Sequence, residues 1–300
     1  MNDSISNYLE LAMRAAREAG DYARNVQRSE LKIETKTNAM DIVTQVDSRN
    51  EQTIRDTVLA LYPDHVFLGE ELGSSEATTP YALLEKEGEK TPPPFQGGGR
   101  GVVDGLVKWI IDPIDGTVNY AHGLPIWCVS IGVEVNGVVE CGAIYQPNLN
   151  EMFSVRRGEG AFLNGERIAV SIESDATKSL FVTGFPYNVD ENPEGVIEQF
   201  SKFLHKGWLI RRLGSAALDL AYVACGRLEG FWEIGLSPWD TSAGQLMVRE
   251  AGGRITHYDG TDYNIYKRSI IATNGLQHDR IFHLLSDAEE SFRSSARSAS

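Results

Sequence analysis

The run WIIDPIDGT, residues 109–117, constrains the fold more than any other stretch of the chain. Its apolar and β-branched beginning is typical of the end of a buried strand. Asp112 and Asp115 follow with a proline between them, which fixes φ and removes a backbone donor, so the turn is predicted to be stiff. Gly116 allows close approach of the backbone to a ligand, and a short helix with free N–H groups is predicted to start at Thr117. The pattern indicates a site for hard cations and phosphate; the alternative interpretation makes Asp112 and Asp115 turn and cap residues.

Composition narrows the class of protein. The chain has 300 residues, of which 42% are hydrophobic and 23% charged, a balance that allows a sizeable globular core. The formal net charge is −14, which makes nucleic acid an unlikely primary partner by this criterion, because phosphate backbones are bound through lysine and arginine. An acidic protein that handles an anionic substrate needs metal cations to offset the repulsion.

The start of the chain and its cysteines indicate a soluble, cytoplasmic protein. Residues 1–4 contain neither the basic nor the apolar region of a secretory signal. No apolar run approaches the roughly 20 residues that span a membrane. The three cysteines are predicted to be buried free thiols in a reducing compartment, because they form no even framework: Cys128, Cys141 and Cys225.

Hydrophobic periodicity predicts an α/β (α+β) fold in two halves. The first half, residues 1–172, begins with an amphipathic helix over 4–27 and a short strand. A polar loop over 36–47 is predicted to turn into a helix start, and the helix continues over 50–62. This half ends in a strand-rich meander with two Asn-Gly turns, at 136–137 and 164–165.

The second half, residues 173–290, alternates strands and helices. One of its helices is predicted to start at Thr241, directly after a loop that carries Asp240. Residues 291–300 contain too few apolar side chains to order themselves, and they are predicted to be a disordered tail. A Pro- and Gly-rich segment at about 74–105 is predicted to be an exposed, mobile insertion between two core strands.

Five acidic residues stand where a strand or helix meets a loop: Asp47, Glu70, Asp112, Asp115 and Asp240. Each has small or apolar neighbours rather than a charge run. Buried carboxylates without partners are costly, so a converging group of acids would require cations. Ligands that are all oxygen favour Mg²⁺ over zinc, and no Cys/His pattern has zinc spacing. The sequence alone does not show that these acids meet in space.

Three blocks resemble the motifs of the inositol monophosphatase family: Gly69-Glu70-Glu71, Asp112 to Thr117, and Trp239 to Gly244. The resemblance extends over roughly residues 15–285. It implies an αβαβα layered sandwich of the inositol monophosphatase and fructose-1,6-bisphosphatase type, usually a homodimer. It also implies Mg²⁺-dependent, Li⁺-sensitive hydrolysis of a small phosphomonoester, with inositol 1-phosphate as the first choice.

The resemblance implies the metal ligands residue by residue. Glu70, Asp112 and the backbone carbonyl of Ile114 would hold one Mg²⁺, and Asp112, Asp115 and Asp240 would hold a second. Glu70 with waters would hold a weaker third, which gives two to three ions per site. Cations that share a carboxylate and the phosphate suit a two-metal displacement at phosphorus.

Catalytic and substrate-binding groups follow from the same resemblance. Thr117 and Asp47 would orient and deprotonate the attacking water, with Glu70 beside them. The substrate-binding set is Asp115, Gly116, Thr117, Ala216, Glu233 and Asp240, in which the amides of the glycine and threonine would hold phosphate oxygens. For Glu233 the alternative is a surface acid at a strand end.

Two neighbours of this set are less specific. Lys36 resembles a loop lysine of the family that lies near the third metal, and its alternative is a solvated surface lysine. Glu71 is not expected to be a ligand, because adjacent residues that follow a strand point in opposite directions.

Other functions remain open at this point. The substrate could instead be another sugar, polyol or histidinol phosphate, fructose 1,6-bisphosphate, or a 3′-phosphoadenosine nucleotide. A rival of another class is a regulatory or RNA-associated binding protein that kept the fold and lost catalysis. The segment 73–105 is longer than the turn that usually joins the two metal-binding strands of the family, which leaves the substrate range open.

Overall fold

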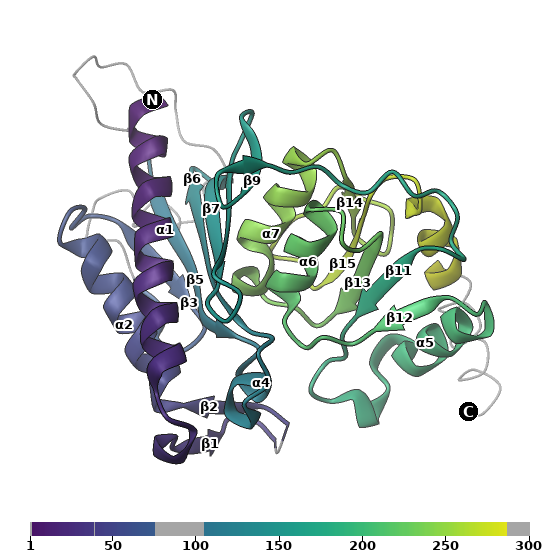
Figure 1. The fold of residues 1–300 in the computed structure, drawn as a ribbon, viewed down its shortest axis with the longest axis horizontal. Helices are drawn as coiled ribbons and strands as arrows, with labels where there is room; N and C mark the ends of the chain where they lie inside the picture. The colour runs from purple at the N-terminus through teal and green to yellow at the C-terminus, as the bar shows by residue number, and fades with distance from the viewer. Residues whose placement is uncertain (1, 39, 76–104, 287–300) are drawn as a thin grey trace, which may run out of the picture.

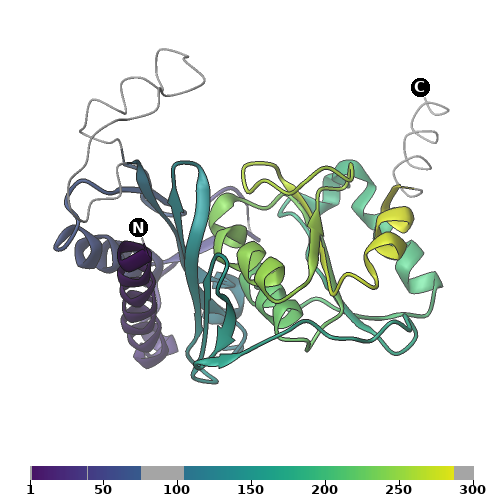
Figure 2. The ribbon, with the colours of Figure 1, turned by 90° about the horizontal axis from the view of Figure 1, so that it is seen from above.

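The computed structural model describes residues 2–38, 40–75 and 105–286, and it has alternating layers of helices and sheets (Figure 1). Seen from above, the order is helices, sheet, helices, sheet, helices (Figure 2). Helices α1 (Asn2–Asn25) and α2 (Gln45–Leu59) cover the outer face of the larger sheet. Helices α6 (Ala216–Ala224) and α7 (Pro238–Glu250) lie between the sheets. The predicted αβαβα sandwich is therefore confirmed.

The larger sheet has eight strands in the order β10-β9-β8-β7-β6-β5-β3-β4. Its strands are β3 (Val66–Gly69), β4 (Gly73–Ser74), β5 (Val107–Asp115), β6 (Cys128–Val135), β7 (Val138–Gln146), β8 (Glu151–Arg156), β9 (Gly160–Leu163) and β10 (Glu166–Arg167). Only β3 and β5 run parallel; the other pairs are antiparallel. Both Asn-Gly turns have positive φ at both residues, 53° and 81° at 136–137 and 50° and 85° at 164–165, as predicted.

The smaller sheet has five strands in the order β12-β11-β13-β15-β14. Its strands are β11 (Leu180–Thr183), β12 (Leu209–Arg211), β13 (Gly230–Ile234), β14 (Arg254–Thr256) and β15 (Ser269–Thr273). Helix α5 (Val196–His205) and a helix over 278–286 cover its outer face. The shorter helices are α4 (Thr117–His122), η1 (Arg28–Glu30), η2 (Val189–Glu191) and η3 (Pro193–Gly195).

Strand β5 shows why its sequence is an unbroken apolar run. Trp109 and Ile111 pack against the core under α1 and α2, whereas Ile110 packs against α6 and α7. Successive side chains of a strand point to opposite faces, so a strand covered on both faces needs apolar residues at every position. One continuous core joins the larger sheet, the α6–α7 layer and the smaller sheet. The predicted division at residue 172 therefore stays a prediction.

One loop prediction and one helix boundary were wrong. Residues predicted as a polar loop form strand β2 (Ile42–Thr44), antiparallel to β1 (Ile33–Thr35). Helix α2 starts at Gln45, because Thr44 and Asp47 form a capping box that ends the strand and begins the helix. Helix α7 likewise starts at Pro238 on a Ser237 cap, so Asp240 lies inside its first turn rather than in a preceding loop.

The remaining predictions concern the insertion, the tail and the cysteines. Most of the predicted insertion at 74–105 lies outside the described residues, although Ser74 is part of β4 and pairs with Leu68. The tail at 291–300 also lies outside them. The cysteines are free as predicted, but only Cys128 and Cys141 are fully buried. Among the described helices, none has the length and apolar character needed to cross a bilayer.

Candidate active site

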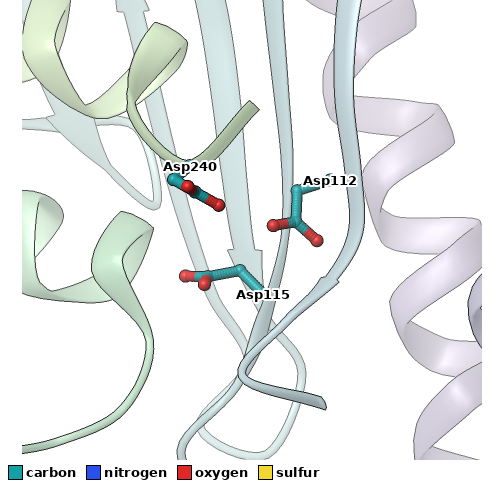
Figure 3. A group of neighbouring side chains, drawn as sticks. All are labelled: Asp112, Asp115 and Asp240. Atoms are coloured by element: carbon teal, nitrogen blue, oxygen red, sulfur yellow. The ribbon is translucent and has the colours of Figure 1, made fainter. Parts of the chain in front are cut away.

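Three carboxylates meet at the junction between the larger sheet and the α6–α7 layer. Asp112 and Asp115 project from β5, and Asp240 projects from the first turn of α7 (Figure 3). One oxygen of each can be chosen so that all three lie within 4.8 Å of one another. The side chains of Asp112 and Asp115 are buried, and that of Asp240 is half-buried.

A β-bulge brings the two acids of β5 to the same side. Residues three apart on a regular strand would face opposite sides of the sheet. Here Asp112 pairs with Ser130 and Asp115 pairs with Cys128, so β5 uses one more residue than β6 between these pairs. Strand β5 therefore continues to Asp115, whereas the sequence predicted a turn after Ile111. Pro113 is compatible with this position, because a bulge removes one ladder hydrogen bond.

Asp115 is held by the start of α6. Its Oδ2 accepts hydrogen bonds from the Ser215 hydroxyl at 2.5 Å and from the Ala217 amide at 2.7 Å, and the Cys128 thiol lies at 3.7 Å. Asp240 is held by its own helix, since its Oδ2 accepts a bond from the Ser237 amide at 2.6 Å. These contacts fix the two carboxylates before any ligand arrives.

The cluster is electrostatically strained. Burial raises the pKa of Asp112 well above its usual value, and the charges of Glu70, Asp115 and Asp240 raise it further. Burial likewise raises the pKa of Asp240, together with the charge of Asp115. Carboxylate oxygens that are close, buried and mutually repulsive fit a hard divalent cation, which offsets this repulsion.

Glu70 directly follows β3 and lies outside the group of three aspartates, although its charge raises the pKa of Asp112. Lys36 donates to Glu70 Oε1 at 2.9 Å and to Glu71 Oε1 at 2.5 Å. The expectation that Glu71 points away from Glu70 was wrong, because β3 ends at Gly69 and the two acids lie in a turn, where strand alternation does not apply. Burial alone would lower the pKa of Lys36, but the two acids raise it above its usual value.

Thr117 and Asp47 form a buried pair next to the cluster. The Thr117 hydroxyl lies 3.0 Å from Asp47 Oδ1 and 2.9 Å from the carbonyl oxygen of Ile114, and its single proton serves one of them at a time. Asp47 Oδ2 accepts bonds from the amide and hydroxyl of Thr44 at 2.9 and 2.5 Å. Burial raises the pKa of Asp47 to about 6, although the bonds from Thr44 lower it.

Gly116 sets the direction of α4 and is its N-cap. Its φ of 95° lies in the left-handed region. A Cβ at this position would lie 3.0 Å from the Ile126 carbonyl oxygen and 3.1 Å from that of Gly214. Only glycine fits this position without strain. Helix α4, which Gly116 caps, starts two residues after Asp115, so its N-terminus lies beside the acid cluster.

Ala216 and Glu233 lie on the second half of the chain. Ala216 begins α6, directly after the Ser215 that holds Asp115. Glu233 is the fourth residue of β13, and its carboxylate packs against Gly184, where a Cβ would lie 2.2 Å from Oε2. Among the described residues the Glu233 side chain has no hydrogen-bond partner. Burial raises the pKa of Glu233 to about 8, although the positive charge of Arg212 lowers it.

Stability of the metal-free protein should depend on pH through Glu233. Its folded pKa of about 8 exceeds the ordinary value of 4.5, so between these values the folded state binds more protons and stability falls as pH rises. One such group contributes up to about 1.4 kcal/mol per pH unit. Urea unfolding in chelator at pH 5, 6.5 and 8 should show a shallower decline for Glu233→Gln. The exposed Glu166→Gln is the control, and equal slopes for the two variants would refute the assignment.

Several side chains that shape the site were missed from the sequence. Thr44 and Ser237 each stand three residues before an acid, the spacing of a capping box, and this signal could have placed both helix starts. Ser215 and Cys128 contact Asp115 across the chain, and no local pattern indicates such contacts.

The model of the inositol monophosphatase family matches residues 4–290. The chain belongs to this family. As a member of the inositol monophosphatase family it is a phosphatase, with a site compatible with metal binding.

Relatives of this family member carry two kinds of name. The protein named "Nus factor SuhB" of Escherichia coli is 39% identical over 89% of this chain and 91% of that protein. "Inositol-1-monophosphatase" of Synechocystis is 35% identical over 96% of this chain and 92% of that protein.

Solved structures give the same pair of names. The suhB protein of Bartonella henselae superposes with a TM-score of 0.80 and 32% identity, covering 93% of this chain and 98% of that one. The inositol monophosphatase of Anabaena superposes with a TM-score of 0.76 and 36% identity, covering 95% and 97%. The net charge predicted that nucleic acid is an unlikely partner. The relatives named Nus factor do not support this prediction, because that name does not refer to a small-molecule substrate.

Proposed function

We propose that this protein is a Mg²⁺-dependent phosphomonoesterase that hydrolyses a small polyol phosphate, with inositol 1-phosphate as the preferred substrate. The observation that carries the proposal is the group of Asp112, Asp115 and Asp240 oxygens within 4.8 Å of one another, in which the first two side chains are buried and the third is half-buried. These residues and Glu70 would hold the cations, with the Ile114 carbonyl as a further ligand. When bound, divalent cations supply positive charge for the phosphate and lower the pKa of water.

The chain itself supplies the proton acceptor. Thr117 donates its proton toward Asp47 Oδ1 at 3.0 Å, which leaves its oxygen lone pairs free to orient a water. A threonine hydroxyl is a weak base, but the pKa of Asp47 is about 6, close to that of an efficient general base at neutral pH. The water proton then passes to Thr117 as the threonine proton passes to Asp47. The amides of Gly116 and Thr117, at the start of α4, would hold phosphate oxygens.

The leaving-group side supports a polyol. Ala216 has a small side chain, so the backbone at the start of α6 can approach a ring closely. Glu233 has no hydrogen-bond partner among the described residues, so its oxygens are available to hydroxyl groups. Other sugar, polyol or histidinol phosphates and fructose 1,6-bisphosphate carry the same hydroxyl and phosphate chemistry and are the alternatives. Li⁺ inhibition, a homodimer and a cytoplasmic location complete the proposal on the basis of family resemblance.

Removal of metal is the direct test of this proposal. After chelation and desalting, phosphate release from inositol 1-phosphate should fall by at least about a thousandfold, since metal ions supply several kcal/mol of transition-state stabilisation. Addition of Mg²⁺ should restore it, and a panel of esters compared by kcat/KM should rank inositol 1-phosphate first. Full activity in chelator would reject metal dependence. A different best ester would reject the substrate alone.

A second candidate function is supported by the relatives named Nus factor SuhB. In that case the protein acts as a regulatory or RNA-associated binding protein of the same fold, and catalysis is dispensable. Wild-type protein without phosphatase activity toward every ester of the panel, in saturating Mg²⁺, would favour this candidate.

A further inference from the structure

Glu51 is a buried acid that the proposed mechanism does not use. It lies on α2, four residues after Asp47, and its side chain is 0% exposed. Its Oε2 accepts a hydrogen bond from the Glu71 amide at 2.7 Å and one from the Leu72 amide at 3.2 Å. A helix side chain therefore satisfies two backbone donors of the turn that follows β3.

Arg55 completes this contact from the next turn of α2. Its Nε and Nη2 donate to Glu51 Oε1 at 3.0 and 2.6 Å, and Nη2 also donates to the carbonyl oxygen of Gly73. The carboxylate thus accepts hydrogen bonds from the N–H groups of the turn, and the guanidinium donates one to the carbonyl oxygen of Gly73. Buried backbone groups outside a sheet ladder need such partners.

The fit between helix and turn is close. A Cβ at Gly69 would lie 1.9 Å from Glu51 Oε1, so the carboxylate occupies the space that any other residue would fill. The Arg55 guanidinium lies 5.3 Å from the centre of the Phe67 ring, against the same strand. On the other side of the turn, the Glu70 amide donates to the Ile111 carbonyl oxygen of β5 at 3.2 Å. The backbone of Glu70 is thus fixed between β5 and α2.

Helix α2 therefore contacts two parts of the site, Thr117 and the turn that carries Glu70, and holds both in place relative to one rigid element. Side chains four residues apart lie on the same helix face, and on this face Asp47 contacts Thr117 while Glu51 holds the turn that carries Glu70. We propose that Glu51, supported by Arg55, is a positioning residue that sets the place of Glu70 relative to the acid cluster and so determines metal affinity. This inference rests on the proposed function, because it assigns Glu70 to the metal.

The test is a calorimetric titration of the metal-free protein with Mn²⁺ alone, with no substrate present. Glu51→Gln preserves shape but replaces one acceptor oxygen with a donor group, so the turn and Arg55 can no longer both be satisfied. Loss of an outer partner of a metal ligand typically costs about 10- to 100-fold in affinity, and we expect a loss of this size. Asp56→Asn, an exposed acid on the same helix, is the matched control and should bind as wild type.

A positioning role makes a second prediction that a purely structural role does not. Because Glu51 acts through Glu70, the double variant Glu51→Gln/Glu70→Gln should bind Mn²⁺ no more weakly than Glu70→Gln. Hydrogen exchange of the Glu71 and Leu72 amides should accelerate in Glu51→Gln. A lower melting temperature with unchanged Mn²⁺ affinity, or additive losses in the double variant, would overturn the proposal.

A further variant covers the case in which Glu51→Gln does not fold. Arg55→Lys keeps the positive charge but loses the planar fork that bonds Glu51 and Gly73 together. It should weaken Mn²⁺ binding in the same direction, and wild-type affinity in this variant would also overturn the proposal. Failure of the proposed function looks different: wild-type protein would bind Mn²⁺ but release no phosphate from any ester.

Discussion

Asp112→Asn is expected to abolish phosphate release while making the metal-free protein more stable. Asp112 carries a charge that the cluster tolerates poorly, because burial and the charges of four neighbouring acids raise its pKa: Glu70, Asp115, Asp240 and Asp47. Asparagine removes that charge and keeps the shape, so unfolding in chelator should require more urea. With metal, the same change removes a shared ligand and several kcal/mol of transition-state stabilisation, which is about a thousandfold in kcat.

The opposite signs of these two effects separate a metal ligand from a structural acid. A turn or cap residue would lose about 1 kcal/mol of stability and little rate when changed. Glu71→Gln is the neighbouring control, since Glu71 contacts Lys36 and lies outside the three-acid cluster. Its loss of kcat should be smaller by orders of magnitude. Wild-type kcat in Asp112→Asn would refute the assignment of this residue.

The fold was predictable to the extent that its signals are local. The α/β class, the two Asn-Gly hairpins and the start of α4 each depend on local patterns, whereas the αβαβα order of the layers was implied by the family resemblance. Strand β2 was missed because its three residues are too few to show a period, and it is stabilised by pairing with β1 rather than by burial. The capping box at Thr44 and Asp47 was readable from its three-residue spacing, but Thr44 was not identified as the cap of α2.

The geometry of the site depends on contacts that no local pattern contains. Asp112 and Asp115 share a side of the sheet only because β5 bulges against β6, which is a property of the pair of strands. Ser215 reaches Asp115 from 100 residues away. Glu51 resembles any helix acid in the sequence, and only the folded chain shows that its carboxylate fills the space beside Gly69.

The Thr117–Asp47 pair is expected to behave as one catalytic unit. Thr117→Ala removes the hydroxyl that orients water, and Asp47→Asn removes the acceptor of its proton. Each should lower kcat by about a hundredfold or more, the contribution of a positioned acid–base group, with KM much less affected. Groups that act together lose their effect together, so the double variant should be hardly slower than the slower single one. Thr117→Ser should recover part of the rate, because only the hydroxyl is required.

Thr44→Ala separates this role from helix capping. Thr44 bonds the other oxygen of Asp47 and caps α2, and among the described residues it forms no hydrogen bond with Thr117. Its removal should cost about 1 kcal/mol of stability, as for other caps, with a much smaller change in kcat than either member of the pair. The decisive measurements are kcat and urea unfolding for all five variants at saturating Mg²⁺. If the losses of Thr117→Ala and Asp47→Asn multiply in the double variant, or if their rates fall only as far as that of Thr44→Ala, the two residues act separately and the proton route through Thr117 is wrong.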